Sequence, residues 1–206
     1  MELYTMNRKI LILCGSPRKN GNTNTLVKWV KAAAVNVGAE VECIDVVRLK
    51  YKTHGCTACM ACQKSDKFEC VLEDDASPIL RRIPEYDTLV IATPVYCYGP
   101  TAQLKVFTDR MQCLIKFNPE TNEFRHNLAG KTMALIATAG GDYDENLKLL
   151  EMLFSTFANS LGMKFESLLE PFAPHDPQQM QKRTELREKA AAFGSRLLMR
   201  ASNKGN

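Results

Sequence analysis

The sequence has little of what several kinds of protein require. It contains three histidines, and they form no triad pattern with a nucleophile, so histidine-based nucleophilic catalysis is not indicated. No segment approaches the roughly eighteen consecutive apolar residues that a membrane span needs, so we expect no membrane partner. Residues 1–9 lack an apolar core of signal-peptide length, which predicts a cytoplasmic location.

The chain also lacks a large excess of either sign of charge. The formal net charge is +4, and the basic excess comes from residues 178–206, which hold seven Lys and Arg against two Glu. No aromatic interleaving or recognition motif accompanies this charge, so a solvated helix face explains it and we expect no nucleic-acid partner. The length of 206 residues favours one well-buried domain over residues 1–206.

Apolar runs alternate with amphipathic segments along the chain. The runs predict five strands, near residues 11–13, 41–46, 88–93, 131–138 and 164–169. The amphipathic segments predict five helices, at residues 25–37, from about residue 76, and at 101–115, 145–161 and 178–200. This alternation indicates an α/β fold with a doubly wound parallel sheet of the flavodoxin-like strand order 2-1-3-4-5. Ligands of such sheets collect at the carboxyl ends of the strands beside the switch in order, here the first and third strands.

A dense polar turn follows the first strand. Gly15 and Gly21 let backbone N–H groups approach an anion, and the positive end of the next helix dipole faces the same place. The turn has neither the spacing of a nucleoside-triphosphate loop nor that of a dinucleotide fingerprint, so a monophosphate fits best. Polar residues at 22–25 also stand where they would cap the helix. The candidate phosphate-binding residues are Ser16, Arg18, Lys19, Asn22, Thr23 and Asn24.

The motif GSPRKNGNT after a strand near the N-terminus resembles the flavodoxin-like FMN reductases, specifically the branch that contains the iron–sulfur flavoproteins. The resemblance extends over residues 9–169 and implies that this turn holds the phosphate of FMN. It also implies that two later loops, PVYCYGP at 94–100 and TAGGDY at 138–143, contact the flavin ring. These loops add the candidates Pro94, Val95, Tyr96, Tyr98, Gly99, Ala139, Gly140, Gly141 and Asp142.

Glycine and proline are expected to shape the second and third loops. Pro94 and Gly99 would fix a turn whose backbone amides bond the ring carbonyls, while the tyrosines offer flat faces. Gly140 and Gly141 would permit positive φ and close backbone contact. The helix after the second loop carries LKxFxDR, another pattern that resembles the family. Lys105 and Asp109 in it are spaced to pair along the helix, and no catalytic role is assigned to the motif.

Eight cysteines are many for a reducing compartment, where structural disulfides are rare. Cys14 and Cys43 lie inside predicted strands and are expected to be small core residues. Four others form C-x2-C-x2-C-x7-C within a cysteine-rich loop at 47–75, a spacing that suits a [4Fe–4S] cluster and that the resemblance also places here. Zinc and metal-free thiols are the alternatives, although four-cysteine zinc sites usually consist of two separated pairs. The candidate cluster ligands are Cys56, Cys59, Cys62 and Cys70.

Together these features predict an FMN-dependent redox flavoprotein that transfers electrons between a [4Fe–4S] cluster and FMN, which requires no catalytic acid or base. The resemblance implies an electron donor such as ferredoxin or NAD(P)H, and a homodimer or homotetramer. A second hypothesis is an NAD(P)H-dependent FMN or quinone reductase without a cluster. A third is a non-catalytic FMN carrier or thiol redox sensor.

Overall fold

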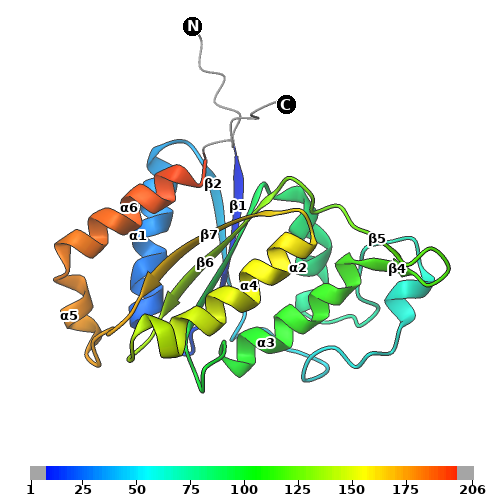
Figure 1. Ribbon diagram of the computed structural model, residues 1–206, viewed down its shortest axis with the longest axis horizontal. Coiled ribbons are helices and arrows are strands. Elements are labelled where there is room, and N and C mark those ends of the chain that lie inside the picture. Colours follow the sequence, from blue (N-terminus) through cyan, green and yellow to red (C-terminus); the bar gives the residue numbers. More distant parts are fainter. Residues whose placement is uncertain (1–7, 199–206) are drawn as a thin grey trace, which may run out of the picture.

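The computed structural model describes residues 8–198. Its main sheet has five parallel strands in the order β2-β1-β3-β6-β7 (Figure 1). These strands are β1 (Lys9–Cys14), β2 (Glu40–Asp45), β3 (Thr88–Pro94), β6 (Thr132–Thr138) and β7 (Lys164–Glu170). Because β6 and β7 are the fourth and fifth strands of this sheet along the chain, the predicted flavodoxin-like order is confirmed.

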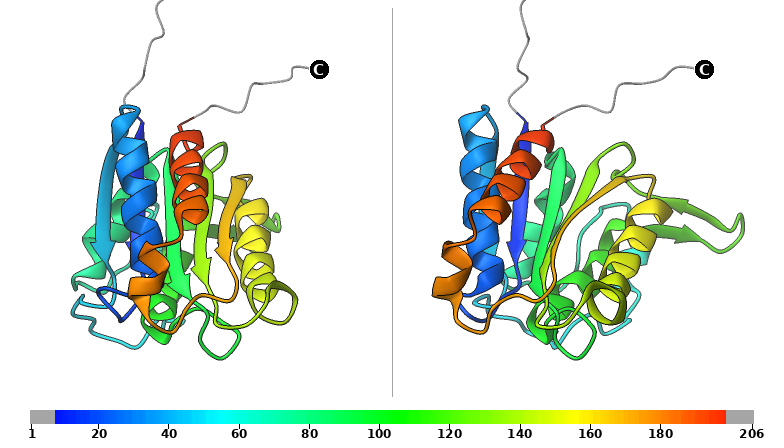
Figure 2. Two further views of the ribbon diagram at one scale, coloured as in Figure 1. Left: turned by 90° about the vertical axis from the view of Figure 1, so that its left-hand side faces the viewer. Right: turned by 60° about the vertical axis from the view of Figure 1, so that its left-hand side comes forward.

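Helices cover both faces of the sheet. They are α1 (Asn22–Asn36), α2 (Ala76–Arg82), α3 (Ala102–Asp109), α4 (Lys148–Ser160), α5 (Pro177–Gln181) and α6 (Thr184–Arg196). Ile10 and Ile12 of β1 face the layer of α1 and α6, which lie side by side in Figure 2. Leu11 and Leu13 face the layer of α2, α3 and α4. Burial on both faces explains why the strands are apolar without alternation. None of the helices described between residues 8 and 198 is long and apolar enough to cross a membrane.

The prediction of one closing helix at 178–200 is wrong, because the structure has two helices, α5 and α6. They are separated at Arg183, whose φ of −81° and ψ of 86° are not helical. The guanidinium of Arg183 pairs with Glu170 and donates to the carbonyl of Phe172 at 3.1 Å. These contacts tie the break to the end of β7. The predicted end at residue 200 lies outside the described residues.

The stretch after α3 also differs from the prediction. The helix predicted at 101–115 ends at Asp109 and continues as a 3-10 turn, Arg110–Leu114. A small antiparallel hairpin follows, made of β4 (Lys116–Asn118) and β5 (Glu123–Arg125). Strands of three residues are too short for an alternating pattern to reveal them, so this hairpin is not among the predicted elements.

Candidate functional site

The three predicted cofactor loops meet at the carboxyl edge of the sheet, which is the lower edge in Figure 1. The hydroxyl of Thr23 in the first loop shares a hydrogen bond of 2.7 Å with that of Thr138, which begins the third loop. In the second loop, the Val95 N–H donates to the Thr138 carbonyl at 2.8 Å. The Thr101 hydroxyl donates to the Gly15 carbonyl at 2.6 Å. Thr23, Thr101 and Thr138 are all buried, so these bonds fix the loops relative to one another.

The first loop packs tightly against α3 at Gly15. A Cβ built on this glycine would lie 2.7 Å from the Cβ of Leu104 and 3.1 Å from the carbonyl oxygen of Ala92. The Gly15 N–H also donates to that carbonyl at 2.8 Å. A glycine is therefore needed here for close approach.

Helix α1 begins without a side-chain cap. Its N-cap is Gly21, so the expectation that polar side chains at 22–25 cap the helix is wrong. The Asn22 amide instead donates to the Pro174 carbonyl at 2.6 Å, and the Asn24 amide donates to the Arg18 and Lys19 carbonyls at 3.1 and 3.2 Å. Among residues 8–198, no side chain therefore competes with an anion for the first-turn N–H groups of the helix.

Several groups of the first loop could bind a ligand that carries a phosphate and a hydroxylated chain. Arg18 and Lys19 are exposed, and neither forms an ion pair within residues 8–198. The carboxamide oxygens of Asn22 and Asn24 are buried and, within the same residues, have no hydrogen-bond partner. Such acceptors suit the hydroxyl donors of a ribityl chain. Ser16 is buried beside them, and its hydroxyl donates to the Arg18 carbonyl at 3.4 Å.

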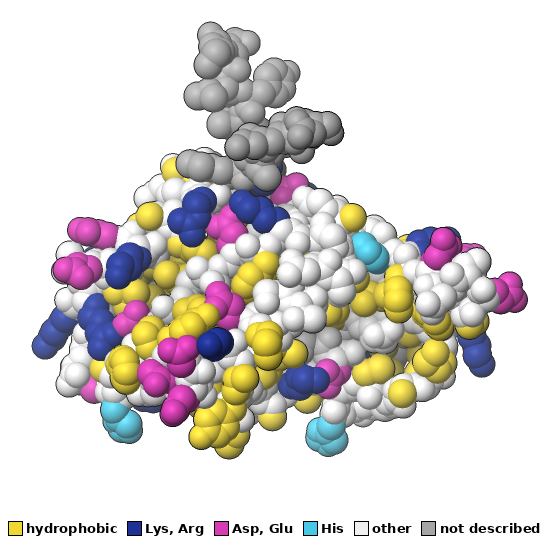
Figure 3. All heavy atoms as spheres, in the orientation of Figure 1, with side chains coloured by type: hydrophobic (Ala, Val, Ile, Leu, Met, Phe, Trp, Pro, Cys, Tyr) yellow, Lys and Arg dark blue, Asp and Glu magenta, His cyan; other side chains and the backbone are white. Residues whose placement is uncertain are grey.

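The second loop is a tight turn with residues of positive φ at its tip. The backbone N–H groups of Tyr96 and Gly99 each donate to the other's carbonyl, at 2.9 and 3.0 Å. Between them, Cys97 has φ of 46° and Tyr98 has φ of 64°, as in a type I′ turn. Gly99 thus closes the turn, as expected, but the left-handed positions are Cys97 and Tyr98. Both tyrosine rings are exposed, and Figure 3 shows hydrophobic side chains along this lower edge.

The third loop is held to β7. The N–H of the buried Ala139 donates to the Glu170 carbonyl at 3.0 Å. Neither Gly140 nor Gly141 has a positive φ, which corrects the expectation for this loop; a Cβ at Gly141 would instead collide with the side chain of Asn146. The Asp142 carboxylate accepts from the Glu145 N–H at 2.9 Å and caps a π-helical turn, Tyr143–Leu147, that leads into α4.

The four cysteines of the predicted cluster motif line one cavity of about 270 Å³ with a largely apolar wall. Ala58 and Met60 have φ of 52° and 56°, whereas Cys59 between them does not have a positive φ. Such alternation turns successive backbone N–H groups to one side and is typical of anion and iron–sulfur sites. A backbone hydrogen bond from Ala61 lowers the pKa of the Cys59 thiol. The donor set and the cavity therefore suit a thiolate-bound cluster, although in residues 8–198 no three potential ligands stand at metal-binding distance from one another.

Two further residues of this cavity were not singled out from the sequence. Cys113 is 2% exposed, and burial raises the pKa of its thiol to about 12, so it is a neutral thiol near pH 7. Arg110 has a fully buried side chain and forms an ion pair with Asp74 at 2.6 Å. Burial opposes ionisation of Asp74, but its hydrogen bonds from Arg110 and from backbone N–H groups hold its pKa below the ordinary value. The only sequence signal was the place of Arg110 in LKxFxDR.

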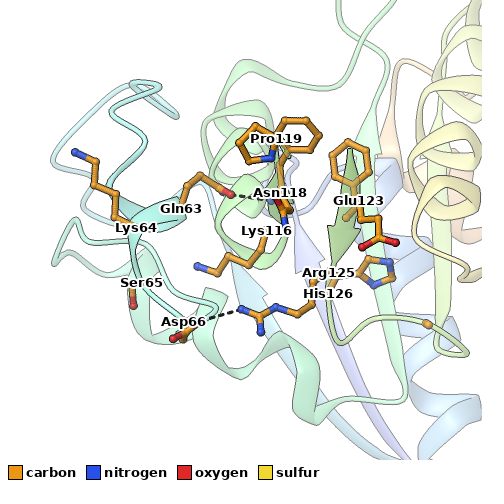
Figure 4. Close-up of a pocket in the computed structure, with 13 residues that line it drawn as sticks. Gln63, Lys64, Ser65, Asp66, Lys116, Asn118, Pro119, Glu123, Arg125 and His126 are labelled. Carbon is orange, nitrogen blue, oxygen red and sulfur yellow. Dashed lines mark hydrogen bonds and ion pairs between the residues drawn. The ribbon is translucent and has the colours of Figure 1, made fainter. Parts of the chain in front are cut away.

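The hairpin β4–β5 anchors the cysteine loop. The ammonium of Lys116 is directed at the carbonyls of Cys62 and Lys67, the latter at 2.5 Å. The Gln63 side chain donates to the Ile115 carbonyl at 2.8 Å and accepts from the Phe117 N–H at 3.0 Å. Figure 4 shows Gln63 and Lys116 at a second, open cavity of about 1040 Å³ between the loop and the hairpin. The cysteine loop is thus attached at its middle as well as at its ends.

Cys43 is not the core residue expected, because it is exposed on the edge strand β2. Cys14 is half-buried and packs against the core cluster that includes Ile10 and Ile12. Hydrogen bonding to Cys14, supported by the positive charge of Lys31, lowers the pKa of Cys43 to about 7 despite partial burial. The same contact and burial raise the pKa of Cys14.

An open parallel sheet with an uncapped helix and three linked loops at its switch point defines the class of flavodoxin-like proteins. Residues 8–170 match the sequence model of the family described as NADPH-dependent FMN reductase, and the chain belongs to this family. This family match supports a flavin-dependent oxidoreductase.

Similar proteins indicate which branch of the family the chain resembles. A protein of Archaeoglobus fulgidus named iron-sulfur flavoprotein is 38% identical over 105 residues, which cover 50% of this chain and 45% of that protein. One of the same name from Methanocaldococcus jannaschii is 31% identical over 147 residues, which cover 71% of each. The chain thus spans less than half the length of the first relative. Both matches support the iron–sulfur flavoprotein branch of the family.

Solved structures share the fold. An FMN-dependent NADH-azoreductase from Bacillus anthracis in complex with FMN has a TM-score of 0.69 at 16% identity, covering 93% of this chain and 100% of that chain. An NAD(P)H:quinone oxidoreductase from Methanothermobacter marburgensis has a TM-score of 0.68 at 16% identity, covering 94% and 98%. At such identities the likeness shows the fold alone.

Proposed function

We propose that the protein is an FMN-dependent electron-transfer flavoprotein whose cysteine cavity holds a [4Fe–4S] cluster. The observation that carries this proposal is the convergence of all four motif cysteines on one cavity with an apolar wall. When bound, the cluster supplies one-electron transfer and FMN supplies one- or two-electron transfer. The proposed cluster ligands are Cys56, Cys59, Cys62 and Cys70.

The residues proposed to hold FMN belong to the three linked loops. The uncapped N-terminus of α1 and the exposed cations Arg18 and Lys19 would bind the phosphate. The unpaired oxygens of Asn22 and Asn24 would accept hydrogen bonds from ribityl hydroxyls. Backbone groups at 94–99 and 139–142 would meet the polar edge of the ring, with the exposed tyrosines of the second loop beside its faces.

The residues around the cysteine cavity have separate tasks. The left-handed residues Ala58 and Met60 turn the backbone so that its N–H groups can face sulfur. Lys116 anchors the Cys62 carbonyl, which limits how far the loop can open. Cys113 lies on the turn after α3, outside the four-cysteine motif, and is not proposed as a ligand.

The proposal includes the partners and the setting of the reaction. The family match supports NAD(P)H as a hydride donor, and a one-electron donor such as ferredoxin suits the proposed cluster. A reducing cytoplasm suits a loop with exposed thiols. We include a homodimer or homotetramer on the basis of the family resemblance.

The test is the absorption spectrum of protein purified without air, before and after dithionite, together with iron, sulfide and FMN contents. We expect bound flavin plus about four iron and four sulfide per chain in the wild type. Cys59→Ser should lose iron and sulfide but keep FMN, whereas the control Cys113→Ser should keep all three. A pure flavin spectrum without iron or sulfide in the wild type would contradict the proposed cluster.

The family match favours a second candidate, an NAD(P)H-dependent FMN or quinone reductase without a cluster. A variant with serine at all four motif positions separates the two functions. A reductase would keep its rate of NAD(P)H oxidation in this variant, whereas the proposed electron-transfer protein would lose reduction by a one-electron donor. Reversible disulfide formation with altered partner binding, and no turnover, would instead indicate the FMN carrier or thiol sensor.

A further inference from the structure

We propose that Arg110 is a positioning residue of the cysteine cavity, which directs a buried positive charge at Cys70 and so raises the reduction potential of the cluster. This inference rests on the proposed function, because it concerns the reduction potential of the cluster proposed to bind in the cavity. Arg110 lies at the start of the 3-10 turn after α3, and it lines the cavity together with Cys70 and Cys113.

The guanidinium is anchored on one side only. Its Nη1 donates to Asp74 at 2.6 Å, and its Nη2 donates to the Leu72 carbonyl at 3.3 Å and to the Ser77 hydroxyl at 3.1 Å. The Nε atom is buried and, within residues 8–198, has no hydrogen-bond partner. The Nη contacts alone would be enough if Arg110 served only to attach the cysteine loop to the turn after α3. The buried, unpaired Nε is the observation that a purely structural role leaves unexplained.

Cys70 lines the same cavity as Arg110 and stands two residues before Leu72, whose carbonyl accepts from the guanidinium. An arginine guanidinium is not deprotonated in proteins, so its charge is permanent. Asp74 pairs with Nη1, which leaves the buried Nε available to a group in the cavity. Because Asp74 is itself 3% exposed and fixed by backbone N–H groups, the guanidinium has little freedom to turn away.

A buried cation next to a thiolate-bound cluster affects its reduction potential. The cluster with its four thiolates is negatively charged, and one-electron reduction makes it more so. A nearby cation and an N–H donor to sulfur stabilise the reduced form more than the oxidised form, which raises the potential. Little water can screen this interaction, because the Arg110 side chain is 0% exposed.

The test uses protein reconstituted with iron and sulfide, and follows the reduced cluster by electron paramagnetic resonance during a potentiometric titration. At a fixed ambient potential, Arg110→Gln should lower the ratio of reduced to oxidised cluster by about tenfold, equal to about 59 mV for a one-electron couple. Arg110→Lys keeps the charge but lacks the Nε–H fork, so it should give a smaller shift in the same direction. Iron content should stay near that of the wild type in both.

Arg81→Gln is the matched control. Arg81 pairs with Glu69, the neighbour of Cys70, at 2.7 Å, but its side chain is 59% exposed and does not line the cavity. This variant should leave the potential unchanged. Arg110→Gln alone leaves Asp74 buried and unpaired. If that variant does not fold, the double variant Arg110→Gln with Asp74→Asn removes both charges. The reduction potential of its cluster should still be lower than that of Asp74→Asn alone.

The outcomes separate this inference from the proposed function. A wild-type protein that takes up no iron and sulfide refutes the proposed function and the inference with it. A wild type with a full cluster whose potential is the same in the Arg110 variants refutes the inference alone. An equal shift in Arg81→Gln and Arg110→Gln also refutes it, because any loss of charge near the loop would then suffice.

Discussion

Gly15→Ala tests whether the first loop depends on close approach to α3. The added Cβ would lie 2.7 Å from the Leu104 Cβ and 3.1 Å from the Ala92 carbonyl oxygen, so the loop or the helix must shift. Overpacking of this kind costs about 1–3 kcal/mol, and weakening the bond from Thr101 to the Gly15 carbonyl costs about 1 kcal/mol more. We therefore expect a free energy of unfolding lower by about 2–4 kcal/mol.

The same displacement should weaken FMN binding, because it moves the turn that precedes the N-terminus of α1. We expect the FMN Kd to rise by at least about tenfold, which corresponds to about 1.4 kcal/mol. Urea unfolding of the FMN-free protein and titration of flavin fluorescence measure the two effects separately. Gly140→Ala is the control for stability, since no atom lies within 4 Å of its added Cβ. It should leave unfolding within about 0.5 kcal/mol of the wild type. Wild-type stability and FMN affinity in Gly15→Ala would refute the reasoning.

Three further predictions follow from buried or perturbed groups. Thr138→Val leaves the Thr23 hydroxyl without its partner and should cost about 1–3 kcal/mol in urea unfolding, whereas adding Thr23→Val should recover part of that loss. Asp74→Asn breaks a buried ion pair and should lower the free energy of unfolding by about 3–5 kcal/mol, measured the same way; a loss under about 1 kcal/mol would show that the pair is solvated. The thiolate is the reactive form of Cys43, so its alkylation rate, followed by peptide mass spectrometry, should rise with pH and level off above a midpoint of about 7. A midpoint near the ordinary thiol pKa would contradict the effect of its contact with Cys14.

The sequence was sufficient for the sheet and for the place of the cofactor loops, because both follow from the order of apolar runs and turns. The strand order needs only parallel crossovers, and the candidate residues of three loops then fall at one edge. Residue types could not show which positions in those loops are left-handed. Cys97 and Tyr98 take positive φ although Gly99 stands next to them, because the mutual hydrogen bonds of Tyr96 and Gly99 select the turn type.

Some residues of the cysteine cavity could also not be predicted from the sequence. The four-cysteine spacing is local and could be recognised, but Arg110 and Cys113 reach the cavity from a turn some 40 residues beyond the last motif cysteine. Their role depends on how the turn after α3 packs against the loop. No pattern along the chain encodes that packing. The hairpin that holds Gln63 was missed for a different reason, since its strands are too short to show alternation.

The bond from the Asn22 amide to the Pro174 carbonyl has a consequence for synthesis on the ribosome. It joins residues that are 152 positions apart, and α6, which covers α1, is translated later still. While the chain is being made, the first loop emerges early but lacks both partners, and the apolar face around Ile10 and Val30 stays uncovered. Flavin capture at the proposed site should therefore follow translation of the segment around Pro174, which completes the first loop.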